Sequence, residues 1–134
     1  NNKIKEIVPK NSIIFTDIAI KNYSKDLDNY QKLIEYRSDP GINYLTQSKR
    51  QFYLLSSSFF YDKPKYIEKF NEMVKRNLNI IYEDQDPKEI IKSNYINNYF
   101  ILTKKENLNK ILRIKKNINI IDDSYALIEI TGNT

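Results

Sequence analysis

This chain of 134 residues carries 22 Lys and Arg against 17 Asp and Glu, a formal net charge of +5, and it contains no His, Cys or Trp. The missing His and Cys exclude zinc sites of the usual nitrogen and sulfur kind, thiol nucleophiles, Ser-His-Asp triads and disulfide frameworks. The length indicates a single compact domain over residues 1–134.

The composition also bears on partners and on location. Ile, Lys, Asn and Tyr all have codons rich in A and T, so genome bias explains much of the Lys content. Lys outnumbers Arg 18 to 4 and is scattered, whereas nucleic-acid binders cluster their cations, so we expect no nucleic-acid partner. Met73 is the only Met, which predicts a piece excised from a longer protein. No apolar run approaches the roughly 20 residues that span a bilayer.

In chain order, residues 1–11 form a polar leading segment that Pro9 closes. Residues 12–20 are rich in β-branched and aromatic side chains and predict a buried strand. The spacing of apolar residues over 24–39 then predicts a helix, which ends at the Asp-Pro-Gly turn of residues 39–41.

The middle of the chain alternates in the same way. Residues 52–56 predict a second strand, and Pro64 opens a helix that we expect to stop at Asn77. The short apolar run over 78–82 predicts a third strand. Asp86-Pro87-Lys88-Glu89 then combines a capping acid, Pro at the first helical position and a second acid, which is a specific helix start signal.

Residues 99–103 predict a fourth strand, and Thr103 to Glu106 repeat the capping pattern at the start of another helix. Two strand-like runs over 118–130 flank the turn-forming residues 122–124 and predict a closing β-hairpin. The sequence therefore predicts an α/β fold: a three-layer, Rossmann-like, mostly parallel sheet with helices on its faces and a C-terminal antiparallel hairpin.

Asp17 is the first candidate site residue, because open α/β sheets bind ligands at the carboxyl ends of their strands. Haloacid dehalogenase-type phosphoryl-transfer enzymes also begin with a strand that ends in Asp. They need a second Asp two positions later, where this chain has Ala19. We therefore expect a loop or capping carboxylate and predict no catalytic residue.

Asp84 and Asp86 form the D-x-D pattern with which metal-dependent nucleotide-sugar transferases hold a divalent cation. Carboxylates suit this task, since Mg²⁺ and Mn²⁺ prefer hard oxygen ligands. The same pattern recurs at Asp26 and Asp28 on a predicted helix, and a helix cap also explains Asp86. Both acids stay candidate ligand-binding residues, while no metal site and no cofactor are predicted.

Arg37 and Asp39 belong to the most distinctive polar loop, and Arg37 could bind a carboxylate or phosphate bidentately. The plainer interpretation pairs Arg37 with Asp39 at the end of a helix. The aromatic residues Phe52, Tyr53 and 59–61 could stack on sugar rings or bases, although core packing is the simpler expectation.

Several features also follow one another in a familiar order. They are the Ile-Val-Pro-Lys-Asn-Ser-Ile-Ile-Phe-Thr-Asp opening that ends at Asp17, the Tyr36-Arg37 loop, the apolar strands at 79–82 and 99–102, and the hairpin over 118–130. This order resembles the soluble C-terminal domains of polytopic membrane proteins of the GT-C glycosyltransferase superfamily and their uncharacterised relatives. In that family the catalytic acid lies in an early loop between membrane helices, and no position here matches it.

The resemblance implies a non-catalytic, membrane-associated domain on the extracytoplasmic side of an integral-membrane, glycosyltransferase-like protein. Its partners would be the membrane-embedded part of the parent protein and a carbohydrate or lipid-linked sugar, with a scaffold or substrate-recognition role. The alternative is a small metal-dependent enzyme that acts on phosphate or nucleotide-sugar groups through Asp17, Asp84 or Asp86. A third hypothesis is a Lys-based binder of anionic ligands or membrane surfaces.

Overall fold

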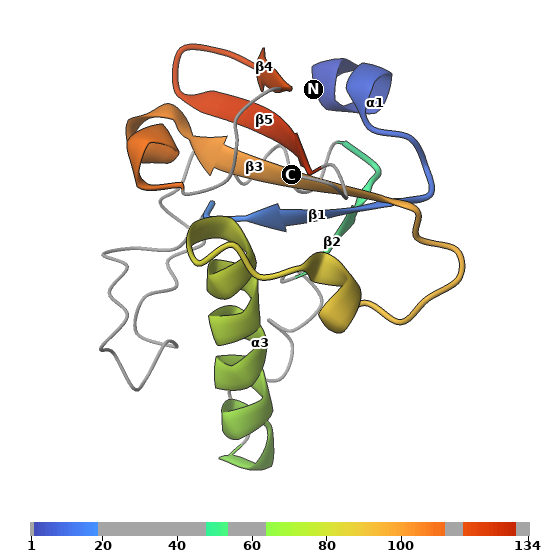
Figure 1. Ribbon diagram of the computed structural model, residues 1–134, viewed down its shortest axis with the longest axis vertical. Coiled ribbons are helices and arrows are strands. Elements are labelled where there is room, and N and C mark those ends of the chain that lie inside the picture. Colours follow the sequence, from blue (N-terminus) through green and yellow to red (C-terminus); the bar gives the residue numbers. More distant parts are fainter. Residues whose placement is uncertain (1, 19–47, 54–63, 112–116, 131–134) are drawn as a thin grey trace.

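The computed structural model describes residues 2–18, 48–53, 64–111 and 117–130 (Figure 1). Its helices are α1 (Asn2–Ile7) and α3 (Pro64–Tyr82), with two short 3-10 helices, η3 (Pro87–Glu89) and η4 (Lys105–Lys110). Its strands are β1 (Ser12–Thr16), β2 (Gln51–Phe52), β3 (Asn98–Lys104), β4 (Ile118–Ile120) and β5 (Tyr125–Ile130). The helix predicted over 24–39 lies outside the described residues, as does the end of the predicted second strand.

The five strands form one mixed sheet in the order β2-β1-β3-β5-β4. β1 is parallel to both β2 and β3, whereas β5 is antiparallel to both β3 and β4. Helices combined with this sheet confirm an α/β fold. The expectation of a mostly parallel sheet is too strong, because the antiparallel pairings equal the parallel ones in number.

The closing hairpin is confirmed, with Ile118 opposite Ile128 and Ile120 opposite Ala126. Its turn follows from the chemistry of Asp122, whose Oδ1 accepts hydrogen bonds from the backbone N–H groups of Ser124 at 2.7 Å and Tyr125 at 2.9 Å. A short side chain that satisfies the donors of its own turn is what Asp commonly provides at such positions.

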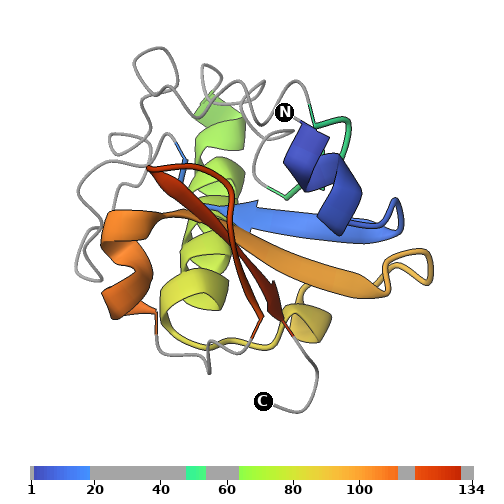
Figure 2. The same cartoon turned by 90° about the horizontal axis from the view of Figure 1, so that it is seen from above.

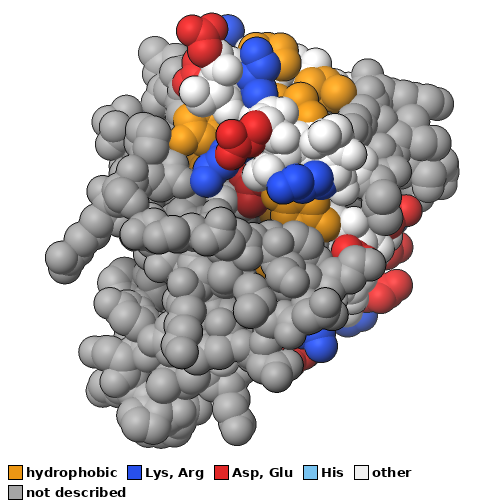
Figure 3. All heavy atoms as spheres, turned by 90° about the vertical axis from the view of Figure 1, so that its left-hand side faces the viewer, with side chains coloured by type: hydrophobic (Ala, Val, Ile, Leu, Met, Phe, Trp, Pro, Cys, Tyr) orange, Lys and Arg blue, Asp and Glu red, His pale blue; other side chains and the backbone are white. Residues whose placement is uncertain are grey.

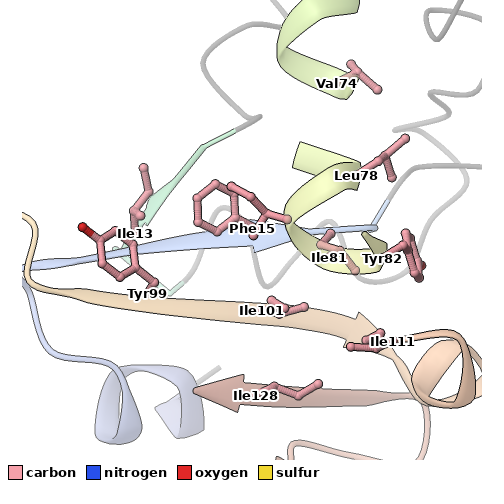
Figure 4. Close-up of a cluster of buried hydrophobic side chains, with 11 residues drawn as sticks. Ile13, Phe15, Val74, Leu78, Ile81, Tyr82, Tyr99, Ile101, Ile111 and Ile128 are labelled. Carbon is pink, nitrogen blue, oxygen red and sulfur yellow. The ribbon is translucent and has the colours of Figure 1, made fainter. Parts of the chain in front are cut away.

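The sheet separates two apolar clusters, and alternate residues of β1 point to opposite sides. Ile13 and Phe15 pack with the C-terminal half of α3, where Val74, Leu78 and Ile81 are buried (Figure 4). On the other side, residues of α1 pack with β1, β3 and β5 in a cluster made of Ile4, Val8, Ile14, Ile18, Phe52, Phe100, Leu102, Ile121, Tyr125 and Leu127. Seen along the sheet, α1 and α3 lie on opposite sides of it (Figures 1 and 2).

The N-terminal segment forms helix α1, whereas the sequence predicted only a polar leading segment over residues 1–11. Ile4 and Val8 lie one helical turn apart, and both are almost fully buried against the sheet. Arg50 secures the end of this helix, because its Nε donates to the carbonyl of Val8 at 2.7 Å and its Nη2 to that of Lys5 at 3.1 Å. These bonds satisfy carbonyls that a helix C-terminus otherwise leaves free.

Helix α3 continues to Tyr82, so the expected stop at Asn77 and the expected strand over 78–82 are wrong. Val74, Leu78, Ile81 and Tyr82 recur at helical spacing on the buried face. β-branched and aromatic content favoured a strand locally, whereas packing on the sheet stabilises the helix. Within the described residues, no helix combines the length and the apolar character needed to cross a membrane.

Replacing Arg50 with Ala is expected to lower the free energy of unfolding by about 1–3 kcal/mol, because charge-assisted hydrogen bonds to two carbonyls are lost. Urea denaturation measures this loss, and amide exchange over residues 4–8 should accelerate locally. The matched control is Lys110→Ala at an exposed position of η4, with a change within about 0.5 kcal/mol. Equal effects of the two substitutions would contradict the capping role.

Candidate functional site

The carboxyl end of β1 is the place in this sheet where a ligand site is expected. β1 lies between β2 and β3, so the chain leaves β1 toward one side of the sheet and later returns on its other side. Ligands of open α/β sheets bind at such switch points, beyond the carboxyl ends of the strands. Asp17 follows β1 directly and is only 2% exposed.

Four donors surround the Asp17 carboxylate. Oδ2 accepts hydrogen bonds from the Tyr82 hydroxyl at 2.6 Å, the Thr103 hydroxyl at 2.6 Å and the Asn107 side-chain amide at 2.8 Å. Oδ1 accepts from the backbone N–H of Lys104 at 3.2 Å. Hydrogen bonds to an ionised acceptor are stronger than neutral ones, so the carboxylate joins the end of α3, the end of β3 and η4.

Thr16, the residue before Asp17, also makes several buried hydrogen bonds. Asn77, fully buried on α3, accepts from the Thr16 backbone N–H through Oδ1 at 3.3 Å and donates to the Thr16 carbonyl through Nδ2 at 2.9 Å. The Thr16 hydroxyl donates to the carbonyl of Leu102 at 2.7 Å. An amide that pairs with both backbone groups of one residue acts as a neighbouring strand would, and it fixes the position from which Asp17 reaches its partners.

Asp84 and Asp86 lie beyond the end of α3, and both are exposed. Asp84 adopts a left-handed backbone conformation with φ of 62°, which Asp tolerates better than most residues. The predicted helix start at Asp86 is confirmed as the 3-10 helix η3, where its carboxylate accepts from the Lys88 backbone N–H at 3.0 Å. Among the described residues no group of three or more His, Cys, Asp or Glu side chains could hold a metal ion.

Of the three predicted site residues that the structure describes, Asp17, Asp84 and Asp86, only Asp17 belongs to a buried polar cluster. Arg37 and Asp39 lie outside the described residues. Tyr82, Thr103 and Asn107 were not predicted as site residues, since Tyr82 was assigned to a strand and Thr103 to a helix cap. In fact Lys104 precedes η4 without a side-chain cap, and the Thr103 hydroxyl turns to Asp17 instead.

A cavity of about 450 Å³ lies on the α3 side of the sheet, lined by residues that include Ile13, Tyr53, Met73, Ile91 and Tyr95. Tyr95 is 85% exposed, whereas Tyr53 packs against Phe15 with ring centroids 5.3 Å apart. Burial raises the pKa of Tyr53 above its ordinary value, and Arg76 opposes that rise only in part. Core packing therefore accounts for Tyr53, and Phe52 is buried as well; residues 59–61 lie outside the described residues.

Comparison of the chain with protein-family profiles, curated proteins and solved structures finds no match. Four donors and a nearly complete burial describe a carboxylate that the fold itself uses.

Replacing Asp86 with Ala is expected to destabilise the protein by about 0.5–2 kcal/mol through loss of the cap on η3. Asp86→Ser should restore most of that stability, because a Ser hydroxyl caps a helix without supplying a carboxylate. Thermal unfolding of both variants makes the comparison. A Ser variant as unstable as the Ala variant would show that the negative charge, rather than the cap, is what matters at this position.

Proposed function

We propose that this chain is a non-catalytic, extracytoplasmic domain of an integral-membrane, glycosyltransferase-like protein, with a scaffold or substrate-recognition role. The order of strands and loops that resembles C-terminal domains of the GT-C superfamily supports the membrane setting. The membrane-embedded remainder of the parent protein is then its principal partner, and a carbohydrate or lipid-linked sugar is the ligand class. The domain lies on the extracytoplasmic face.

The hydrogen bonding of the Asp17 carboxylate supports the proposal that the domain is non-catalytic. A nucleophile or general base needs a free oxygen within hydrogen-bond reach of the reacting group. Both oxygens of Asp17 are engaged by donors from Tyr82, Thr103, Lys104 and Asn107. The residue at the expected ligand position therefore serves to hold α3, β3 and η4 together.

We also propose that the fold is a three-layer, Rossmann-like arrangement. Packing of α1 on one face of the sheet and α3 on the other supports this arrangement. So does the strand order around β1, which places β2 and β3 on either side of it in parallel orientation. A Rossmann-like sheet without a Gly-rich phosphate loop fits a recognition role better than a nucleotide-binding one.

The flanking gene sequence tests the membrane setting. We expect the reading frame next to this stretch to encode several apolar segments of about 20 residues, each able to span a bilayer. A frame that encodes no such segment on either side would remove the basis of the proposal.

The competing function is a metal-dependent enzyme that acts on phosphate or nucleotide-sugar groups, and the position of Asp17 at the switch point favours it. Thermal unfolding in the presence of Mg²⁺ or Mn²⁺ separates the two, because a cation that binds only the folded state raises the unfolding temperature. We expect no saturable rise. A rise that Asp17→Asn abolishes would favour the enzyme.

A further inference from the structure

Among the side chains that the structure describes, the excess of positive charge lies in two segments, residues 2–11 and 48–53. Residues 2–11 and 48–53 carry five basic side chains, Lys3, Lys5, Lys10, Lys49 and Arg50, against the single acidic Glu6. Elsewhere, the residues whose side chains the structure describes include eight basic and ten acidic ones. The excess of positive charge in the described part of the protein therefore belongs to this region alone.

Contacts bring the two segments of this basic surface together. The Arg50 guanidinium donates to the carbonyls of Lys5 and Val8, so the stretch that leads into β2 lies against the end of α1 (Figures 1 and 2). Lys10 follows this helix end by three residues and is exposed, as is Lys49 beside Arg50. Sequence positions about 40 residues apart thus share one surface.

The backbone at Lys49 supports a role for this surface. Lys49 is a non-glycine residue in the left-handed region, with φ of 56°, a conformation that costs roughly 1–2 kcal/mol for such residues. The fully buried Ser48 accepts from the Arg50 backbone N–H at 3.3 Å, and the Arg50 Nη1 donates to the Lys49 carbonyl at 3.2 Å. Its neighbours thus hold Lys49 in a strained conformation with the side chain exposed.

The side of the molecule that carries η4 has a different distribution of charge. There, basic and acidic side chains alternate over the described part of the surface (Figure 3). A surface of mixed sign has no net attraction for a charged partner, since neighbouring opposite charges cancel within a Debye length of about 8–10 Å. The basic surface around α1 is therefore distinct from the rest of the described surface.

We propose that this basic surface, formed by Lys3, Lys5, Lys10, Lys49 and Arg50, docks onto an anionic phospholipid bilayer. Four of its five cations are Lys, of which Lys3 donates to the carbonyls of Ile120 and Ile121 at 3.4 Å each. The Arg50 guanidinium is occupied by the carbonyls of Lys5, Val8 and Lys49, so it offers no planar fork to bases or phosphodiesters. The only aromatic residues in segments 2–11 and 48–53 are Phe52, which is buried, and Tyr53, which packs against Phe15, so neither offers bases an open stacking face. Lysine point charges suit lipid headgroups.

The burial of the apolar side of α1 indicates how the domain would bind a bilayer. Ile4 and Val8 are buried against the sheet, so the helix has no free apolar face to insert among acyl chains. Binding is then electrostatic and superficial, and it weakens as salt screens the charges. The inference rests on the proposed membrane setting, in which the domain already lies beside a bilayer and needs only orientation.

Co-sedimentation with vesicles tests the inference. The probe is phosphatidylcholine with about 30 mol % phosphatidylglycerol, compared with pure phosphatidylcholine. The test variant combines Lys5→Gln, Lys10→Gln and Lys49→Gln, and Arg50 is kept because it caps α1. The matched control combines Lys75→Gln, Lys88→Gln and Lys110→Gln, which removes the same charge from exposed positions elsewhere.

We expect binding to anionic vesicles alone, and its loss on raising NaCl from about 0.05 to 0.5 M. The test variant should bind at least tenfold more weakly, since each basic residue near an anionic surface contributes about a fivefold factor, whereas the control should stay within about threefold. Equal weakening of the two variants, or no vesicle binding by the natural sequence, would overturn the inference. So would binding to an oligonucleotide with the same lysine dependence and none to vesicles. A failure here leaves the flanking-gene test of the proposed function intact.

Discussion

Replacement of Asp17 by Ala is expected to lower the free energy of unfolding by about 3–5 kcal/mol, because buried donors left without an acceptor cost about 1–3 kcal/mol each and their effects are not additive. The donors are the hydroxyls of Tyr82 and Thr103, the Asn107 amide and the Lys104 backbone N–H. Urea denaturation followed by circular dichroism measures the loss.

The Asp17→Asn variant keeps the size of the side chain and removes its negative charge, so the same experiment measures the contribution of the charge to stability. Its carbonyl can still accept, but its amide group would face donors, so we expect a loss between those of the natural sequence and the Ala variant. Asp123→Ala, at an exposed position of the hairpin turn, is the control and should change stability by no more than about 0.5 kcal/mol. A loss below about 1 kcal/mol for Asp17→Ala would mean that the carboxylate is dispensable to the fold and free for another role.

Asn77→Ala is expected to cost about 2–4 kcal/mol, because the Thr16 backbone N–H and carbonyl both lose their buried partner. Asn77→Asp tests the donor separately. A carboxylate can accept from the Thr16 N–H but presents negative charge to the Thr16 carbonyl, so this variant should gain little stability over Ala at neutral pH.

The matched control for both variants is Asn94→Ala, since Asn94 is exposed. It should leave the urea midpoint almost unchanged. An Asn77→Asp variant as stable as the natural sequence would rule out the bond from Nδ2 to the Thr16 carbonyl as a determinant of stability. Loss of the Asp17 contacts in the Asn77→Ala variant, visible as faster exchange of the Lys104 amide, would link the two polar clusters.

Local signals were sufficient where an element depends on its own residues. β1, β3 and the hairpin were predicted because runs of β-branched residues and the turn chemistry of Asp122 act over a few positions. η3 was found because Asp86 and Pro87 form a complete start signal. The position of Asp17 was predicted only in part, since the strand was expected to run to residue 20, whereas β1 ends at Thr16 and Asp17 follows it directly.

Long-range packing decided the rest. The segment after Asn77 has strand-like composition, yet it is helical because Leu78 and Ile81 reach the same apolar cluster from one helical face. Asn77 looked like a helix stop, although its amide is buried against β1, 61 residues earlier in the chain. The partners of Asp17 lie 65 to 90 residues away, and no local pattern relates such positions.

At the Thr103 to Glu106 segment, too, a local sequence pattern did not predict the contacts of one residue, Thr103. Its sequence satisfies the capping pattern, but the buried Thr103 hydroxyl donates to Asp17 and η4 begins without a side-chain cap. Donation to Asp17 does not use up the lone pairs with which a hydroxyl caps a helix. The cap is missing because β3 extends to Lys104, so Lys104 rather than Thr103 occupies the cap position of η4.

Broadening of NMR signals by substoichiometric Mn²⁺ tests most directly whether the fold itself uses Asp17. The reporters are the Lys104 amide and the Asn107 side-chain amide, both hydrogen-bonded to the Asp17 carboxylate, with the buried Leu127 amide as reference. We expect the reporters to keep the same relative intensity as the reference. Selective broadening of the two reporters that Asp17→Asn removes would show a cation at Asp17 and contradict a purely structural carboxylate.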